Sequence, residues 1–375
     1  MEVYKHIRYA TAGRFEEPIQ AGFSAGTAVL AQPTGCPQGH FRLNFLMKEP
    51  EPMILSEDCL FLNIWTPSRA GKYPVLVWIH GGAYVAGSGE EAAYDGGALC
   101  LQGNIVVVTI SYRLGAFGYL YSEEDGICNL GMKDQIAALR WVKANIARFG
   151  GDADRITVAG QSAGGHSVTA IIASCNEPLF HKAIIQSAPL GMCTKRKDGK
   201  ALYEMMLKAA GKPLKALSAD ELLDVQNKVI KQSRSMMPFS PVAPDFSGRV
   251  SVPSLESVLI TWQKDDASPF VALALGHEDG FGSIIDRIAT RAASRKVFAQ
   301  PAMRYARALA AAGIPTETCC LDWRPKGSPF GACHCLELSL LFGSWERWQG
   351  ARMLGQTSRK EWEEKANELR ERWIS

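Results

Sequence analysis

Apolar and polar residues follow two alternating patterns along the chain. Short continuous apolar runs, rich in β-branched residues, are typical of buried strands, and the segments between them carry apolar residues at helical spacing. The strand-like runs are residues 74–80, 104–112, 155–160, 182–188, 270–277 and 316–323. Continuous apolar strands separated by helices predict an α/β protein, with a mostly parallel central sheet that helices cover on both faces.

A long helix is predicted over residues 133–148. Ile136, Leu139, Val142 and Ile146 lie at helical spacing and form one apolar stripe. The sequence FGGD follows, and its glycines end the helix.

The last predicted helix opens with a capping box in which Ser358 pairs with Glu361. Its apolar stripe consists of Trp362, Ala366, Leu369 and Trp373. We expect this stripe to pack on the body of the protein, and a contact with a second copy is the alternative.

Composition and charge exclude several classes of protein. Hydrophobic residues make up 47% of the 375 residues and the net charge is +3, which is typical of a globular enzyme and too apolar for disorder. No cluster of basic and aromatic residues indicates nucleic-acid binding, and no apolar run approaches the roughly 18 residues of a membrane span. The ten cysteines form no C-x-x-C pair, and no group of residues has metal-ligand spacing, so no metal or cofactor is expected. The first residues, MEVYKHIRYATAGRF, contain no signal-peptide core, which favours a cytoplasmic protein.

The stretch ITVAGQSAGGHSV, residues 156–168, places a single serine, Ser162, between a strand-like run and a helix-capable run. Glycines two residues before and two residues after the serine leave room for a strand that reverses sharply into a helix. This G-x-S-x-G pattern predicts that the hydroxyl of Ser162 is presented as a nucleophile.

Backbone donors for an oxyanion are expected after the strand-like run VLVWI. The sequence HGGA that follows contains Gly82 and Ala83, whose N–H groups could approach a bound carbonyl closely together with the N–H of Ala163. A glycine pair after a strand is, on its own, equally compatible with a simple turn.

With these motifs in place, the chain resembles the type-B carboxylesterases, the α/β-hydrolase family of cholinesterases, bile-salt lipase and para-nitrobenzyl esterases. SEDCLFLNIWTP resembles one family signature, HGGAYVAGSG its oxyanion loop, and residues 129–165 its nucleophile segment. Weaker matches extend from YATAGRFEEP to FSPVAPDFSG and GACHCLELSLLFG, so nearly the whole chain takes part. The resemblance implies an α/β-hydrolase fold that hydrolyses carboxylic esters through an acyl-enzyme.

The resemblance also implies a catalytic triad in the chain order serine, acid, histidine. Ser162 matches the nucleophile, and His334 in GACHCLEL matches the general base. The acid of the family stands before a glycine after a strand, and here that segment reads GHEDG. Asp279 is therefore the expected acid, with Glu278 as the alternative.

Residues around the triad match the family less completely. Glu337 and Ser187 resemble polar residues near the catalytic base, whereas Gln161 replaces the usual glutamate before the nucleophile, which disfavours choline esters as substrates. The remaining matches are the buried ion pairs Arg14–Glu57 and Arg113–Asp134 and the disulfide cysteines Cys36 and Cys59, for which reduced thiols are favoured here.

The family's chains are usually considerably longer. We therefore predict a single catalytic domain, residues 1–375, with a reduced cap formed by a helical insertion at about residues 191–250, and an open pocket whose candidate walls are Tyr84 and Phe281. For both residues plain packing is the alternative. The predicted activity is hydrolysis of short-chain or aryl esters by a monomer or weak homodimer. A lipase, an amide or carbamate hydrolase and a non-catalytic binding protein are the alternatives.

Overall fold

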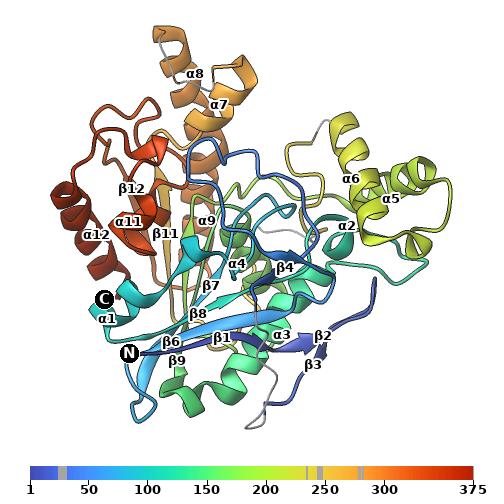
Figure 1. Cartoon of the computed structure of the whole chain (residues 1–375), viewed down its shortest axis with the longest axis horizontal. Helices are drawn as coiled ribbons and strands as arrows, with labels where there is room; N and C mark the ends of the chain where they lie inside the picture. Colours follow the sequence, from blue (N-terminus) through green and yellow to red (C-terminus); the bar gives the residue numbers. More distant parts are fainter. Residues whose placement is uncertain (24–31, 234, 243–247, 278–279, 281–282, 375) are drawn as a thin grey trace.

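The computed structural model describes residues 1–23, 32–233, 235–242, 248–277, 280 and 283–374. Its centre is an eight-stranded sheet in the order β1-β6-β8-β7-β9-β10-β11-β12 (Figure 1). The first two pairings in this order are antiparallel and the other five are parallel. The strands are β1 (Glu2–Arg8), β6 (Phe61–Thr66), β8 (Val106–Ile110), β7 (Tyr73–Ile79), β9 (Gly151–Gln161), β10 (Lys182–Gln186), β11 (Ser257–Gln263) and β12 (Thr316–Leu321).

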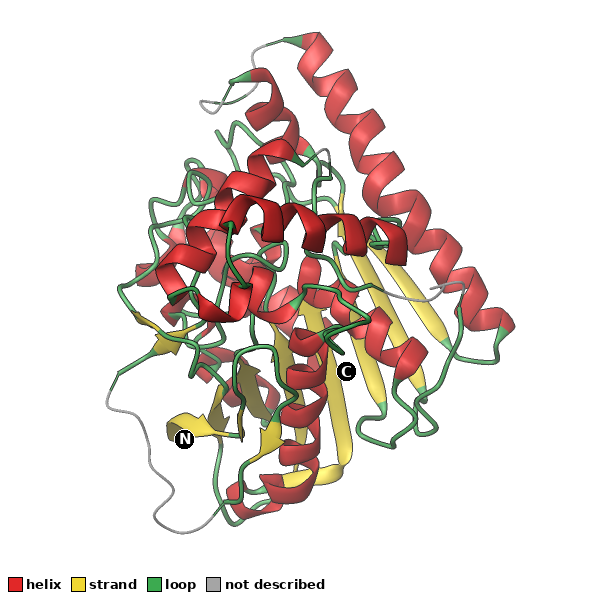
Figure 2. Ribbon diagram, turned by 90° about the vertical axis from the view of Figure 1, so that its right-hand side faces the viewer, coloured by secondary structure: helices red, strands yellow, loops and turns green. Residues whose placement is uncertain are grey.

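Helices cover both faces of this sheet (Figure 2). The α-helices are α1 (Gly97–Gly103), α2 (Gly115–Gly118), α3 (Leu130–Asn145), α4 (Ala163–Ser174), α5 (Arg196–Ala210), α6 (Ala219–Gln232), α7 (Ser268–Leu275), α8 (Ile284–Ser294), α9 (Gln300–Ala311), α10 (Leu336–Leu341), α11 (Trp345–Trp348) and α12 (Arg359–Ile374). A π-helical turn, η4 (Arg295–Ala299), joins α8 to α9, and the long helix at the right of Figure 2 consists of these three pieces. Shorter pieces are the 3₁₀ turns η1 (Ala92–Tyr94), η2 (Ile146–Phe149), η3 (Leu214–Ala216) and η5 (Arg352–Leu354), and the strand pairs β2 (Ala10–Thr11) with β3 (Ile19–Gln20) and β4 (Thr34–Gly35) with β5 (Ile54–Leu55).

Strand β7 shows why the apolar runs are continuous. Val75, Val77 and Ile79 belong to one buried apolar cluster, and the alternate residues Leu76 and Trp78 belong to a second cluster. Because successive side chains of a strand point to opposite faces, both faces of the sheet are buried. The predicted α/β architecture is confirmed.

The expected helices are present. Helix α3 is followed directly by η2, which ends at Gly150 with a φ of +78°. In α12 the N–H of Glu361 donates to the hydroxyl of Ser358 (3.2 Å), and the apolar stripe predicted for this helix is buried. The prediction that α12 packs on the body is confirmed.

The prediction of a strand over residues 270–277 is wrong. These residues lie mostly in α7, which has Pro269 in its first turn and ends at Gly276 with a φ of +69°. The strand of this region is β11, whose sequence SVLITWQ is richer in β-branched and aromatic residues than FVALALGH. Alanine and leucine favour a helix, and Pro at the start and Gly at the end are helix boundary signals.

Other contacts implied by the resemblance are present. The guanidinium of Arg113 donates two hydrogen bonds to buried Asp134 (2.8 Å each), and Nε of Arg14 donates to Glu57 (2.9 Å).

The range 191–250 contains helices α5 and α6, which pack against each other. The two cysteines that the resemblance pairs, Cys36 and Cys59, are free buried thiols.

Candidate active site

Ser162 lies at the sharp turn between β9 and α4, with φ and ψ angles of +55° and −121°. Such angles are strained for a residue with a Cβ atom. The backbone holds the turn on both sides, because the N–H of Ser162 donates to the carbonyl of Gln186 (2.8 Å) and its carbonyl accepts from the N–H of His166 (2.9 Å). The turn places Ser162 at the carboxyl edge of the parallel strands.

The glycines on both sides of Ser162 allow very close backbone contacts. A Cβ atom on Gly160 would lie 2.5 Å from the carbonyl carbon of Gly164, and a Cβ atom on Gly164 would lie 2.0 Å from the carbonyl oxygen of Ile79. Any side chain at these positions would push the strand and the helix apart. The structure thus gives the physical reason for the G-x-S-x-G pattern.

The segment predicted to supply oxyanion donors lies against Ser162. A Cβ atom on Gly81 would lie 3.2 Å from Cβ of Ser162. Gly82 and Ala83 have φ angles of +106° and +54°, and no hydrogen bond between described residues uses their N–H groups. Ala163 is the first residue of α4, where an N–H has no acceptor within the helix. The N–H groups of Gly82, Ala83 and Ala163 therefore remain candidate oxyanion donors.

His334 follows β12 in the chain and is buried together with Asp266. The distance from Nδ1 of His334 to Oδ1 of Asp266 is 2.6 Å, and both side chains are at most 2% exposed. Asp266 stands three residues after the end of β11, and its other oxygen accepts the N–H of Gln263 (2.9 Å). The rings of Phe270 and Phe298 lie 5.1 and 5.3 Å from the imidazole, so the contact with Asp266 is shielded from water.

The acid expected from the resemblance was Asp279, with Glu278 as the alternative. Both lie outside the described residues. The strand that was to carry them is helix α7, and the carboxylate that contacts His334 is Asp266. Sequence reasoning missed Asp266, although the signal was available in β11 followed directly by KDDA.

Gln161 contacts the other nitrogen of the imidazole. Its amide nitrogen lies 3.2 Å from Nε2 of His334 and 3.5 Å from the sulfur of Cys335, both of which can accept a hydrogen bond. A neutral imidazole whose Nδ1 donates to Asp266 has a lone pair on Nε2, which fits an amide donor. No hydrogen bond between described residues joins the Ser162 hydroxyl to His334. The amide of Gln161 instead occupies Nε2, the atom that has to accept the serine proton if His334 is the general base.

Glu337 and Ser187 lie at the same edge of the sheet. Glu337 is 1% exposed and accepts the amide of Gln263 (2.7 Å). Burial, and then the nearby Asp266 carboxylate, raise the pKa of Glu337 to about 7. Ser187 follows β10 with a φ of +45°, and its buried hydroxyl has no hydrogen-bond partner among the described residues.

The two expected pocket walls have different outcomes. Tyr84 is fully buried in the core, where its hydroxyl lies 2.7 Å from Nδ1 of His166 and accepts a hydrogen bond from Ser167 (3.2 Å). This tyrosine does not line the cavity beside Ser162, because its ring turns toward α4 and packs on Tyr119. Phe281 lies outside the described residues.

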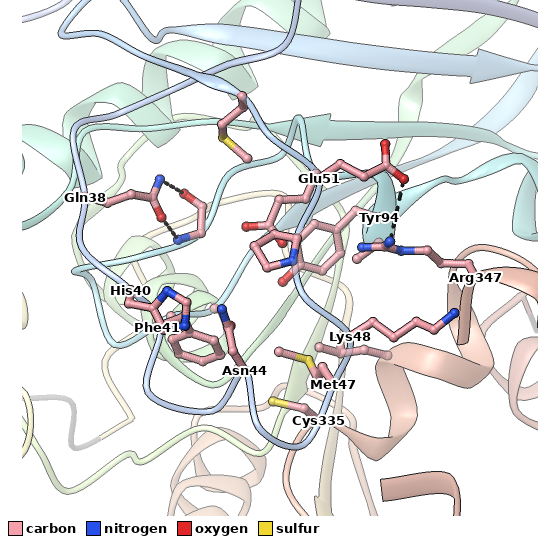
Figure 3. A pocket seen from close by; sticks show the side chains of 18 of the residues that line it. Gln38, His40, Phe41, Asn44, Met47, Lys48, Glu51, Tyr94, Cys335 and Arg347 are labelled. Atoms are coloured by element: carbon pink, nitrogen blue, oxygen red, sulfur yellow. Dashed lines mark hydrogen bonds and ion pairs between the residues drawn. The ribbon is translucent and has the colours of Figure 1, made fainter. Parts of the chain in front are cut away.

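A cavity of about 330 Å³ lies between the oxyanion segment and residues 38–55 (Figure 3), and its lining includes Gln161, the neighbour of Ser162 in the chain, but not Ser162 itself. Gly81, Gly82, Gln161 and Cys335 belong to its lining. Apolar side chains make up much of the remaining wall and include Phe41, Met47, Met53, Leu55, Tyr94, Leu338 and Trp348. No motif in the sequence marks residues 38–55, which are mostly loop and form a cavity wall only when they fold over the sheet edge.

Charged side chains also line this cavity. Arg347 lies 3.6 Å from Glu51, and both are drawn in Figure 3 with Lys48. Burial raises the pKa of Glu91, a further lining residue, to about 7. Two cations therefore face two carboxyl groups, one of them partly protonated at neutral pH, and the lining has little net charge.

The described residues contain neither a cluster of metal ligands nor a membrane-spanning helix. In that part of the chain no three histidine, cysteine or acidic side chains cluster as a metal site. None of the helices there combines the length and the apolar character needed to cross a membrane.

Comparisons with known proteins identify the family of the chain. The model of the carboxylesterase family matches residues 1–312. A probable N-octanoylanthranilate hydrolase of Rhodococcus erythropolis is 34% identical, over 99% of this chain and 87% of the relative, and para-nitrobenzyl esterase of Bacillus subtilis is 33% identical, over 77% and 68%. A solved para-nitrobenzyl esterase structure superposes with a TM-score of 0.83 at 28% identity, over 99% of this chain and 86% of that one. The chain belongs to the carboxylesterase family of carboxylic ester hydrolases and has the α/β-hydrolase fold.

Proposed function

We propose that Ser162, His334 and Asp266 form the catalytic triad of a serine esterase, which forms and then hydrolyses an acyl-enzyme. The observation that carries this proposal is the buried contact of 2.6 Å between His334 and Asp266, at the sheet edge that presents Ser162. A carboxylate on Nδ1 fixes the imidazole in the tautomer whose Nε2 can accept the serine proton.

The chemical step requires a change of partner at Nε2. Gln161 donates to this atom in the structure. When a substrate enters the cavity, the Gln161 amide gives way and the Ser162 hydroxyl takes its place. His334 then accepts the proton while the serine oxygen attacks the acyl carbon, and the protonated imidazole donates to the leaving alcohol.

The N–H groups of Gly82, Ala83 and Ala163 stabilise the oxyanion that this attack creates. Such donors act most strongly where they are preorganised and shielded from water. The positive φ angles of Gly82 and Ala83 support this role, because they direct the turn over Ser162.

The lining of the cavity favours small, uncharged esters with a short acyl chain or an aryl group. A volume of about 330 Å³ is at the lower end for ligand pockets, and the wall is largely apolar with balanced charges. Gln161 supplies no negative charge beside the nucleophile, so cationic choline esters are poor substrates.

Amide hydrolysis is the second candidate, because one relative is named as an N-octanoylanthranilate hydrolase. The same triad can cleave both bonds, and only the rates distinguish them. A p-nitrophenyl ester and the p-nitroanilide of the same acid provide matched substrates for this comparison.

A fluorophosphonate that labels active serine hydrolases tests the proposal directly. We expect one modified peptide, with the label on Ser162 by mass spectrometry, and parallel loss of p-nitrophenyl butyrate hydrolysis. Ser162→Ala should abolish both. Labelling elsewhere, or full activity of Ser162→Ala, would show that the nucleophile is a different residue. Tributyrin and triolein in the same assay separate an esterase from a lipase.

Three further expectations stay predictions. They are a cytoplasmic location, a monomer or weak homodimer, and no binding of nucleic acid. A non-catalytic binding role is disfavoured, because the proposed triad residues are all in place.

A further inference from the structure

A second cavity, of about 290 Å³, lies between helix α8 and the chain from Arg324 to Gly331. It shares no described lining residue with the cavity beside Ser162. One of its walls is Asp265, the neighbour of the proposed catalytic acid, and α8 provides the opposite wall.

Three arginines line this second cavity. Arg287 and Arg291 lie one turn apart on α8, are exposed, and form no ion pair with a described residue. Arg324 is fixed by Asp265, to which its Nε and Nη2 donate (2.8 and 3.0 Å). Three arginines and one aspartate leave the lining with two uncompensated positive charges.

Thr290 shows that a polar partner is missing here. Its side chain lines the cavity and is only 4% exposed, yet its hydroxyl has no hydrogen-bond partner among the described residues. Buried hydroxyl groups are nearly always paired, so an unpaired hydroxyl on a cavity wall points to a ligand. Ser328, whose hydroxyl accepts the N–H of Phe330 (3.3 Å), adds a second hydroxyl group to the same wall.

We propose that this cavity binds a phosphoryl group carried by a small molecule or a lipid. A phosphate monoester has a charge close to −2 at neutral pH and three acceptor oxygens, which match two unpaired guanidinium groups and a free hydroxyl. A single carboxylate would leave one positive charge uncompensated. The volume accommodates a phosphate with a small organic substituent.

The surroundings of the cavity fit a phosphoryl group on a lipid headgroup as well as one on a soluble small molecule. Helices α7 and α8 pack against each other and stand out from the body at the top of Figure 1. Ile284, Ile285 and Ile288 are exposed there by 67%, 75% and 60%, directly beside Arg287. Exposed aliphatic residues next to arginines are typical of surfaces that meet anionic lipids. The experiment therefore needs one arm for each source.

The free-ligand arm measures the binding of sn-glycerol 3-phosphate and inorganic phosphate by calorimetry and thermal shift, against potassium chloride at equal ionic strength. We expect saturable binding that Arg287→Gln/Arg291→Gln weakens about tenfold or more, because charged hydrogen bonds are lost. Arg304→Gln/Arg307→Gln is the matched control, since it removes the same charge from exposed positions of α9 outside the cavity.

Thr290→Val separates a binding role from a structural one. The variant removes the hydroxyl and preserves the shape of the side chain. We expect weaker phosphate binding, by about threefold to tenfold, with no loss of thermal stability in the absence of ligand, because the hydroxyl has no partner to lose. A fall in ligand-free stability together with unchanged binding contradicts the assignment.

The lipid arm measures cosedimentation with vesicles of phosphatidylcholine alone and with added phosphatidylglycerol. Binding only to the anionic vesicles, lost in Arg287→Gln/Arg291→Gln and kept in the α9 control, assigns the phosphoryl group to a lipid. Binding of the free phosphates with the same dependence assigns it to a small molecule. No binding in either arm, or equal losses in the α9 control, overturns the proposal.

Discussion

The Ser162 side of the candidate active site is built from backbone geometry, whereas the His334 side is built from contacts between buried side chains. On the first side a strained serine follows β9, and two of the proposed oxyanion donors, Gly82 and Ala83, have positive φ angles. On the second side Asp266 and Glu337 lie in a dry environment around the imidazole. The first half therefore fails when the backbone moves, and the second half fails when a proton or a charge moves.

The largest expected effect is on the His334 side. Asp266→Asn should lower kcat for p-nitrophenyl butyrate by about a thousandfold to ten-thousandfold, because an amide stabilises the wrong imidazole tautomer. Asp279→Asn is the matched comparison, since the family pattern pointed to that residue. We expect it to stay within about twofold of the unmodified enzyme. The reverse result would assign the acid to Asp279.

The same pair of residues shows what sequence can and cannot predict. The Ser162 turn is encoded by neighbours in the chain, so its glycines and flanking elements were readable directly. The position of the acid depends on which of two apolar runs becomes a strand. Residues 257–263 and residues 270–277 are both short and apolar. Periodicity cannot separate such runs, and β propensity with helix boundary signals was the better guide.

Features made by distant segments were not predictable at all. The loop of residues 38–55 becomes a cavity wall only after folding, and Arg324 meets α8 for the same reason. Tyr84 stands in the oxyanion motif, yet the positive φ angle at that residue turns its ring into the core. Local sequence patterns therefore predicted the backbone turn at Ser162, but they did not predict which buried side chains meet around His334.

Gly82→Ala tests the backbone half. A Cβ atom at this position would lie 1.9 Å from the carbonyl oxygen of Ala86, so the turn must shift and misplace the oxyanion donors. We expect kcat to fall by about 100-fold to 1,000-fold, the usual cost of losing one donor. Gly126→Ala is the control, because Gly126 also has a positive φ (+67°) but no atom within 4 Å of the added Cβ. Equal losses in both variants would mean that general strain, and not donor position, sets the rate.

Glu337→Gln tests the His334 side of the site through the pH dependence of the free energy of unfolding. The folded protein keeps Glu337 protonated up to a pKa of about 7, whereas the ordinary value is 4.5. The resulting stabilisation is complete below about pH 4.5 and is lost as the pH rises through 7. The free energy of unfolding of the variant, relative to the unmodified enzyme, should therefore increase by about 2 kcal/mol between pH 5 and pH 8. Chemical denaturation measures it, with Glu364→Gln, an exposed position on α12, as the control. A difference that is constant with pH contradicts a buried proton on Glu337.

Gln161→Glu affects both halves of the site at once, because Gln161 is the last residue of the strand before Ser162 and contacts the imidazole of the other half. A carboxylate 3.2 Å from Nε2 would favour the protonated imidazole, which cannot act as a base. We expect the pH at which acidification halves kcat/KM to rise by about one unit, with an activity loss that approaches about tenfold on the acidic side and is recovered at alkaline pH. Gln161→Met is the matched control, because it preserves the length of the side chain but introduces no charge, and it should leave the alkaline rate intact. If Gln161→Glu lowers the rate equally at all pH values, the amide supports packing alone and does not control the proton on His334.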